Sequence, residues 1–280
     1  MRVLVTGSSG RIGSKVAERL ALDMDVTGID LCPGDYTTHV GNFTDASLLD
    51  SIMVDVQAVV HCAAYHAPHI GLVDDNLFQE VNVNGTERLL EKALAHRVNR
   101  FVYTSTTSVY GCTTRPKLEA SWVTEQLEPN PEDIYDTTKL AAEELCEQAS
   151  KSGLDTIVLR MSRCFPEPDF LQVFYRLYRG VDAKDVAEAH LLAIRSLSKG
   201  FHTFNISADT PFVKEDCKIL LENPWDVIDQ CFPKAKKLFQ RKGWKLPGSI
   251  DRVYVIEKAK QMLHFKPTRN FEKILAIKTN

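Results

Sequence analysis

The chain has 280 residues, of which 44% are hydrophobic and 25% are charged, and its formal net charge is −3. This length and composition can bury a full core and fit one large α/β domain with a small additional region. The weak negative charge excludes the basic surface that nucleic acid or an anionic membrane requires, so we expect a small-molecule ligand.

The cysteine pattern indicates a reducing compartment. The seven cysteines stand at positions 32, 62, 112, 146, 164, 217 and 231. They are odd in number, and no pair has the Cys-x-x-Cys spacing, which favours free thiols and a cytoplasmic protein. Met1-Arg2 leads directly into a predicted strand without a charged-then-apolar leader, and no apolar run approaches the roughly 18 residues of a membrane span. We therefore expect an unprocessed protein without membrane contact.

Short β-branched runs alternate with amphipathic segments, a pattern typical of parallel strands covered by helices on both faces. The expected strands are 2–6, 25–30, 38–40, 57–61, 100–105, 155–160 and 201–206. The expected helices are 11–21, 45–52, 76–96, 133–151 and one that begins at 181–187. Residues 111–131 form a turn-rich segment, and after residue 207 five prolines predict short helices rather than sheet.

The first predicted strand runs into Thr6-Gly-Ser-Ser-Gly-Arg-Ile-Gly13, directly before an apolar helix. Glycines spaced in this way let backbone approach phosphate and leave N–H groups free at the positive end of a helix, which favours a pyrophosphate. Asp30, at the end of the second strand, can accept from both ribose hydroxyls and would repel a 2′-phosphate. No arginine follows it in Leu31-Cys32-Pro33, so we predict NAD rather than NADP. The alternative is a tight turn that binds no ligand.

Tyr135 and Lys139 stand four residues apart on a predicted helix and therefore share one face. A free phenol titrates near pH 10, and because burial disfavours the phenolate, only nearby positive charge can favour it. Lys139 and an oxidised nicotinamide ring are the candidate charges, so we predict Tyr135 as a general base. The alternative is an ordinary pair on a solvated helix face.

Hydroxyl side chains crowd the carboxyl end of the strand at 100–105, in Tyr103-Thr-Ser-Thr-Thr-Ser-Val-Tyr-Gly111. Ligands bind at this edge of parallel sheets, where a hydroxyl can hydrogen-bond the reacting oxygen of a substrate. Thr106 is the first candidate for that role and Ser105 the second. The alternative is that these hydroxyls only cap the end of the strand.

Six segments in order resemble those of one family: Thr6 to Gly13, Val60-His-Cys-Ala-Ala64, Asn82-Val-Asn-Gly-Thr86, Thr104 to Gly111, Tyr135-x-x-x-Lys139 and Val181-Asp-Ala-Lys-Asp-Val-Ala187. Together they resemble extended short-chain dehydrogenases/reductases of the NAD-dependent epimerase/dehydratase group, from residue 1 to about 206 and more weakly over 258–267. The implied fold is a Rossmann-type doubly wound parallel sheet. Residues 1–165 and 181–206 would form the NAD-binding domain, and 166–180 and 207–280 a small, mostly helical substrate-binding region.

The resemblance implies roles for individual residues. Tyr135 would be the acid/base, Lys139 would bind the nicotinamide ribose and lower the tyrosine pKa, and Thr106 would be the catalytic hydroxyl. The implied cofactor contacts, besides Tyr135 and Lys139, are Gly7, Ser9, Gly10, Arg11, Ile12, Gly13, Asp30, Asn42, Phe43, Cys62, Ala63, Ala64, His66, Asn82, Thr104, Met161 and Ser162. The implied substrate contacts are Thr106, Thr107, Arg163, Arg176 and Arg179.

Departures from the family pattern bear on the subgroup. The family's 4,6-dehydratases carry an Asp-Glu pair after the hydroxyl, where this chain has Thr107-Ser108, so we expect no acid that could expel water. Nucleotide-sugar epimerases carry an asparagine where Arg163 stands, and a long insertion with an arginine where only 169–180 remain. Arg163-Cys-Phe-Pro-Glu-Pro168 instead resembles the corresponding loop of uronate dehydrogenases.

We therefore expect an NAD-dependent oxidoreductase or epimerase that acts on a carbohydrate hydroxyl in the manner of nucleotide-sugar epimerases. A dehydrogenase of a free sugar or sugar acid and a non-catalytic NAD-binding regulator remain as alternatives. The spacing of His61, Cys62, His66 and His69 fits no tetrahedral site, so we expect no metal. In many relatives the helices that correspond to 76–96 and 133–151 pair across a two-fold axis, which implies a homodimer.

Overall fold

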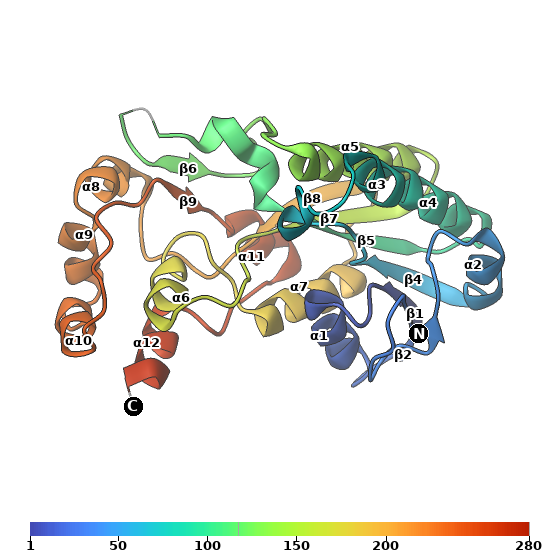
Figure 1. Cartoon of the computed structure of the whole chain (residues 1–280), viewed down its shortest axis with the longest axis horizontal. Coiled ribbons are helices and arrows are strands. Elements are labelled where there is room, and N and C mark those ends of the chain that lie inside the picture. The colour runs from blue at the N-terminus through green and yellow to red at the C-terminus, as the bar shows by residue number, and fades with distance from the viewer. Residues whose placement is uncertain (117, 280) are drawn as a thin grey trace.

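The computed structural model describes residues 1–116 and 118–279 (Figure 1). Its centre is a seven-stranded sheet in the order β3-β2-β1-β4-β5-β7-β8, in which every neighbouring pair is parallel. The strands are β1 (Arg2–Thr6), β2 (Asp25–Asp30), β3 (His39–Val40), β4 (Val56–His61), β5 (Arg100–Thr106), β7 (Asp155–Met161) and β8 (Phe201–Ile206). The predicted parallel sheet and its strands are confirmed.

The strand order reverses next to β1. From β1 the chain moves outward to β2 and β3, and then returns to place β4 on the other side of β1. Thr6 pairs with Ile29 of β2 and with His61 of β4, so the carboxyl ends of these strands lie level with one another. A crevice forms where the strand order reverses, and in open α/β sheets ligands bind there.

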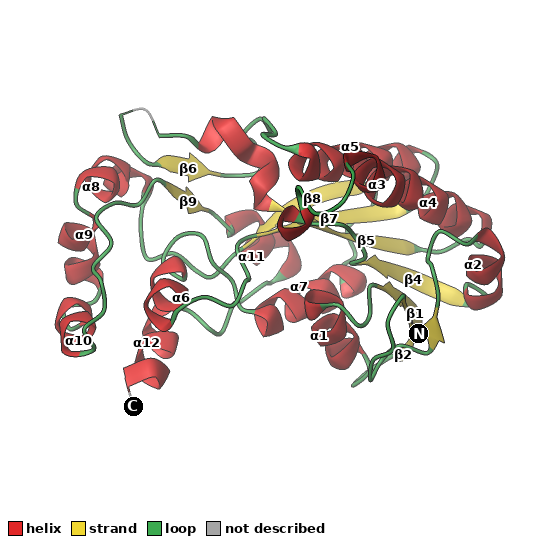
Figure 2. Cartoon of the chain, in the orientation of Figure 1, coloured by secondary structure: helices red, strands yellow, loops and turns green. Residues whose placement is uncertain are grey.

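Helices cover both faces of the sheet (Figure 2). One face carries α1 (Arg11–Leu20), α7 (Ala183–Arg195) and α11 (Glu257–Leu263), and the other carries α2 (Ala46–Ile52), α4 (Gly85–Ala95) and α5 (Ile134–Lys151). On the first face Val16 of α1, Val186 of α7 and Leu263 of α11 belong to one buried cluster. Burial of each such side chain contributes about 1.5–3 kcal/mol. Residues near the C-terminus thus also support the main sheet.

The expected helix over 76–96 consists of three segments. They are α3 (Asp75–Phe78), the π-helical segment η2 (Gln79–Asn84) and α4. Asn82 of η2 is buried, and its side chain accepts from the N–H of Tyr65 and donates to the Tyr65 carbonyl and to Thr138. A period of 3.6 residues does not reveal a π turn, and such turns are frequent near functional sites.

The remaining elements include those of the small region at the left of Figure 1. They are η1 (Ala67–His69, beside the main sheet), η3 (Thr107–Thr114), β6 (Ser121–Val123), α6 (Asp169–Tyr175), η4 (Lys214–Asp216), α8 (Cys217–Glu222), α9 (Pro224–Cys231), α10 (Ala235–Arg241), β9 (Arg252–Tyr254) and α12 (Phe271–Thr279). The strands β6 and β9 pair in parallel, so the expectation of turns alone over 111–131 and of helices alone after 207 was wrong. Each strand has three residues and pairs with a strand that is distant in sequence, so no local sequence pattern marks either of them.

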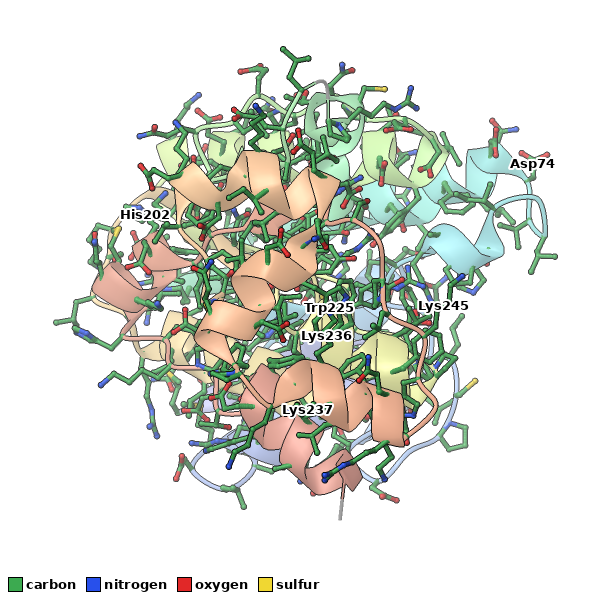
Figure 3. All side chains as sticks on the ribbon, turned by 90° about the vertical axis from the view of Figure 1, so that its left-hand side faces the viewer. Asp74, His202, Trp225, Lys236, Lys237 and Lys245 are labelled. Atoms are coloured by element: carbon green, nitrogen blue, oxygen red, sulfur yellow. The ribbon has the colours of Figure 1, made fainter. Side chains whose placement is uncertain are left out.

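A second core holds the small region together. Phe174, Trp225, Phe239 and Phe271 are buried in one cluster, and the Trp225 indole donates to the Pro247 carbonyl. Figure 3 views this end, with Trp225 labelled among the helices and several lysines on the same face. Within the described residues, no helix has both the length and the apolar character that crossing a bilayer would demand.

Candidate active site

A cavity of about 790 Å³ opens at the carboxyl ends of β1, β2, β4, β5 and β7. The expected cofactor residues that line it are Gly7, Gly10, Arg11, Ile12, Gly13, Asp30, Asn42, Phe43, Cys62, Ala63, Ala64, His66, Thr104, Tyr135, Lys139, Met161 and Ser162. The expected catalytic and substrate residues that line it are Ser105, Thr106, Thr107, Arg163 and Arg179, together with Tyr135 and Lys139. Folding therefore brings into one cavity residues that the sequence distributes over most of the chain.

The glycine turn fits tightly against its surroundings. Gly7 has φ +71°, and a Cβ there would lie 2.7 Å from the Ala63 nitrogen. A Cβ on Gly13 would lie 2.0 Å from the Gly7 carbonyl oxygen. Only glycine fits at either position, and the backbone is thereby exposed to the cavity at the start of the ten-residue helix α1. Free N–H groups at the positive end of a helix suit a pyrophosphate.

Asp30 is held in place by two backbone N–H groups. Its Oδ2 accepts from the backbone N–H of Ser9 at 3.0 Å, and its Oδ1 accepts from the N–H of Cys32 at 3.0 Å. An ionised carboxylate has further lone pairs, so it can also accept from sugar hydroxyls. Ser9 itself does not line the main cavity but borders a smaller one of about 330 Å³. Ser9 therefore supports Asp30 through its backbone N–H and does not face the main cavity.

Asn82, which we expect as a cofactor contact, and His61, whose spacing fits no metal site, both lie behind the cavity wall. Asn82 fixes the backbone of Tyr65, as described above, and does not line the cavity. The His61 ring hydrogen-bonds Thr6 at 2.6 Å and Thr86 at 3.0 Å. Burial, with a smaller effect from the charge of Lys139, lowers the pKa of His61 to about 3. His61 is thus a neutral residue of the core.

Lys139 is buried at the end of β5. Its ammonium donates to the Thr104 carbonyl at 2.6 Å and lies 4.0 Å from the centre of the Tyr103 ring. Burial lowers the pKa of Lys139 to about 8, against the opposing charge of Glu143. The ammonium is therefore fixed by the sheet, one helical turn from Tyr135.

The Tyr135 phenol is not acidic in this arrangement. Burial raises its pKa above the ordinary value, a hydrogen bond with Thr106 lowers it, and the charges of Asp136 and Asp133 raise it further. We expect the Lys139 ammonium and an oxidised nicotinamide ring together to favour the phenolate, whereas the described chain on its own raises the pKa of the phenol. Additional positive charge next to the phenol is needed, and an oxidised nicotinamide ring is the other source that we expected.

The two candidate hydroxyls have different surroundings. The Thr106 hydroxyl lies 2.8 Å from the Ser108 hydroxyl and accepts from the Ser108 N–H at 3.1 Å. The Ser105 hydroxyl instead donates to Glu143 at 2.5 Å, and Glu143 is paired with Arg160 at 2.6 Å in the core. Thr106 therefore lines the cavity on a turn shared with Ser108, whereas Ser105 is committed to a buried network.

Arginines gather at the substrate end of the cavity. Arg163 is paired with Glu167 through a 2.6 Å hydrogen bond, and the sequence-distant Arg252 is paired with Asp251 at 2.7 Å. These two charges are compensated.

Arg179 differs from both. Its guanidinium lies 5.3 Å from the Tyr175 ring, its Nε is buried without a hydrogen-bond partner, and no carboxylate in the described chain lies within ion-pair distance. Arg176, which we also expected as a ligand, lies outside the cavity, is buried, and pairs with Asp182 at 3.5 Å. Among the described residues, Arg179 thus remains without a counter-charge at the substrate end of the cavity.

Sequence reasoning missed several residues that line the cavity: Ser108, Glu132, Asp133, Asp136, Arg252 and Tyr254. Asp136 directly follows Tyr135, and adjacent helical positions do not share a face, so spacing gave no signal for it. Arg252 and Tyr254 belong to β9, and they are the cavity-lining residues of 207–280 in the described chain. The helices α8 to α10 do not line the cavity.

Asp136 also changes one sequence interpretation. The residue is 4% exposed and lines the cavity together with Ser108. We had expected no acid near Thr107-Ser108, but the structure supplies one from the first turn of α5. The lack of an acid at Thr107-Ser108 therefore no longer argues against water elimination.

Known proteins resemble the chain in sequence and in fold. The NAD dependent epimerase/dehydratase family model matches residues 3–170. A dTDP-glucose 4,6-dehydratase of Streptomyces antibioticus is 29% identical over 99% of this chain and 90% of its own length. An L-arabinose 1-dehydrogenase (NAD(P)(+)) of Haloferax volcanii is 32% identical over 57% of this chain and 66% of its own length. This chain spans only 50–62% of the length of several other curated relatives.

The fold has solved counterparts. A short-chain dehydrogenase/reductase superfamily protein from Agrobacterium tumefaciens, solved with bound NAD, superposes with a TM-score of 0.76 at 24% identity, covering 100% of this chain and 96% of that one. This confirms the predicted Rossmann-type fold. The family match covers more than half of the chain, and the family is NAD-dependent by its own description, which confirms the expected cofactor and the expected enzyme class. The chain belongs to the NAD-dependent epimerase/dehydratase family.

Proposed function

We propose that the protein is an NAD-dependent oxidoreductase or epimerase that transfers hydride at a hydroxyl-bearing carbon of a carbohydrate. One observation carries the proposal: Tyr135, Thr106 and Lys139 meet the glycine turn in a single cavity. When bound, NAD supplies the hydride acceptor. Asp30 and the start of α1 would hold its adenosine ribose and pyrophosphate.

The chain's own residues would manage the proton. Thr106 donates a hydrogen bond to the substrate oxygen, and Tyr135 removes the hydroxyl proton from the same oxygen. Lys139, fixed on the Thr104 carbonyl, places a positive charge one turn away on the same helix. Because the Tyr135 pKa is raised by burial, the base is fully formed only when the coenzyme's charge is next to it.

Relatives suggest the leading substrate class, a nucleotide sugar, since one full-length relative is named for dTDP-glucose. A second candidate, the dehydrogenation of a free sugar acid, is favoured by two observations. Arg179 is an uncompensated cation at the substrate end, and no helix from α8 to α10 lines the cavity to hold a second nucleotide. A volume of about 790 Å³ is within the range of roughly 300–1,000 Å³ that holds one drug-sized ligand, so NAD leaves limited room.

Turnover assays on defined sugars test the proposal. The protein is incubated with NAD and UDP-glucose, dTDP-glucose, D-glucuronate or L-arabinose, and NADH and sugar products are measured. Released NADH with an oxidised sugar indicates a dehydrogenase, and an inverted sugar with retained cofactor indicates an epimerase. Thermal shifts with the same ligands extend the search, because native-state ligands raise the midpoint.

A variant pair tests the catalytic assignment. Tyr135→Phe should lose turnover by roughly 10³-fold or more while its NAD affinity changes little. Tyr36→Phe, which removes a phenol hydroxyl outside the main cavity, serves as the matched control and should retain activity. Full activity in Tyr135→Phe would defeat the assignment, and NAD binding without turnover of any sugar would support the regulator.

Two properties of the assembly and location belong to the same proposal. We propose a homodimer through α4 and α5, which pack against each other on one face of the sheet. Light scattering that shows only monomer would contradict it. We also propose a cytoplasmic location, which suits the seven unpaired cysteines.

A further inference from the structure

A buried ion pair beside the active-site cavity has no part in the mechanism above. Glu143 of α5 and Arg160 of β7 are 3% and 6% exposed, and Nη2 of the arginine donates to the carboxylate at 2.6 Å. The arginine Nε also donates, at 3.1 Å from each oxygen of Glu143. The neighbours Ala142 and Cys146 on α5 and Val158 on β7 belong to the apolar cluster of this face. Two charges lose their hydration here, and an apolar pair is often at least as stable, so the fold alone does not require this ion pair.

The ion pair has a third partner at the end of β5. The Ser105 hydroxyl donates to Oε1 of Glu143 at 2.5 Å. Ser105 is the register partner of Arg160 in the neighbouring strand, so two donors from adjacent strands reach the carboxylate that α5 supplies. The elements β5, β7 and α5 are thus joined at one buried carboxylate.

This junction lies next to the residues of the proposed mechanism in two of the three elements. In β5, Ser105 directly follows Thr104, whose carbonyl accepts from the Lys139 ammonium at 2.6 Å. On α5, Glu143 follows Lys139 by four residues and Tyr135 by eight, so the three side chains share one face. A rotation or a shift of α5 at Glu143 would therefore move the ammonium and the phenol relative to the end of β5. Catalytic groups must be held within roughly 0.5 Å of their productive positions.

We propose that Glu143 is a positioning residue, which fixes α5 against the end of β5 so that Lys139 and Tyr135 stand in place in the cavity. The proposal rests on the proposed function, and it gives Glu143 no contact with substrate or cofactor, since Glu143 does not line the cavity. A carboxylate suits this task because it accepts from several donors in defined directions, whereas apolar contacts are non-directional. The Ser105 hydroxyl then serves to hold Glu143 and not to bind substrate.

Two variants separate positioning from support of the fold. The double variant Glu143→Met/Arg160→Met replaces the ion pair by apolar side chains and should have a thermal midpoint at least equal to that of the wild type. Ser105→Ala leaves the ion pair and removes only its link to β5. With NAD and D-glucuronate or UDP-glucose, both should lower kcat by roughly 10- to 100-fold and change the sugar KM by less than about 3-fold.

Two single variants complete the comparison. Glu143→Met alone leaves the Arg160 guanidinium buried without a counter-charge and should lower the thermal midpoint by roughly 5–10 °C. If adding Arg160→Met restores the midpoint but not kcat, the loss of kcat does not come from a weakened fold. Glu144→Met makes the same substitution at the exposed neighbour on α5 and should match the wild type in both measurements.

A wild-type kcat in the double variant or in Ser105→Ala would overturn the positioning role, and so would a kcat that recovers together with the midpoint. Turnover in Ser105→Ala as low as in Tyr135→Phe would also overturn it, because Ser105 would then act on the substrate itself. If the double variant does not fold, the kcat of Ser105→Ala decides alone.

NAD affinity keeps this test separate from the proposed function. If the wild type turns over neither sugar, the proposed function fails for these probes, and calorimetry with NAD decides the positioning role. The family resemblance assigns the nicotinamide ribose to Lys139, so a displaced ammonium should weaken NAD binding by roughly 10-fold in the double variant and in Ser105→Ala. Wild-type NAD affinity in both would then overturn the proposal.

Discussion

Replacement of Asp136 by asparagine should stabilise the folded protein, and should do so more at high pH than at low pH. The pKa of this carboxyl rises from 3.8 to about 6 because folding buries it. The folded state therefore binds the proton more tightly than the unfolded state does, so stability present below about pH 4 is lost as the pH rises through about 6.

The magnitude follows from the size of the shift. A rise of about 2 pKa units at a side chain that is 4% exposed corresponds to about 3 kcal/mol of lost stability at pH 8. At pH 5 about half of that loss is already present, so the difference between variant and wild type should grow by about 1.5 kcal/mol from pH 5 to pH 8. Asparagine has nearly the same volume and leaves the packing in place.

Urea unfolding of both proteins at pH 5, 6, 7 and 8, without nucleotide, measures the difference in the free energy of unfolding. Glu128→Gln controls for the loss of one negative charge, because Glu128 is exposed, and its difference from the wild type should stay within about 0.5 kcal/mol at every pH. Parallel curves for Asp136→Asn and the wild type, or a variant that is less stable at pH 8, would refute the reasoning. A confirmed gain would show that the active site retains this carboxylate at the expense of stability.

Three further predictions concern binding. Gly13→Ala should weaken NAD binding by at least about 10-fold and lower the thermal midpoint, because the alanine Cβ would lie 2.0 Å from the carbonyl oxygen of Gly7. Calorimetry that shows the wild-type NAD affinity would contradict this prediction. Asp30→Ala should weaken NAD and reduce its preference over NADP, which titration of both nucleotides measures, and an unchanged preference would count against the ribose role. Arg179→Met should raise the KM for D-glucuronate by about 10- to 100-fold at constant NAD affinity. Arg176→Met should instead lower the free energy of unfolding by about 1–3 kcal/mol. Equal effects of the two variants on KM would contradict the assignment of Arg179, rather than Arg176, to the substrate.

The sequence predicted the first strand, the glycine turn and the helix after it well because their geometry is local. Gly7, Gly10 and Gly13 lie within one strand-turn-helix unit, whose shape follows from glycine conformation and the hydrophobic period. Likewise, four-residue spacing on a helix placed Tyr135 and Lys139 on one face, and both line the cavity. The π segment at 79–84 and the strands β6 and β9 escaped prediction because no repeating pattern marks them.

By itself the sequence determined the order of strands and helices, the glycine turn before α1, and the helical spacing that sets Tyr135 and Lys139 on one face, since each depends on contacts within a few residues. Only the tertiary structure decided how these groups are charged and which of them have a hydrogen-bond or ion-pair partner. It alone pairs Ser105 of β5 with Glu143 of α5 and leaves Arg179 without a counter-charge among the described residues. It alone brings Ser108 of one element and Asp136 of another into one cavity. The physical reason is that protonation and pairing depend on burial and on neighbours that are distant in the chain, which spacing along a sequence does not encode.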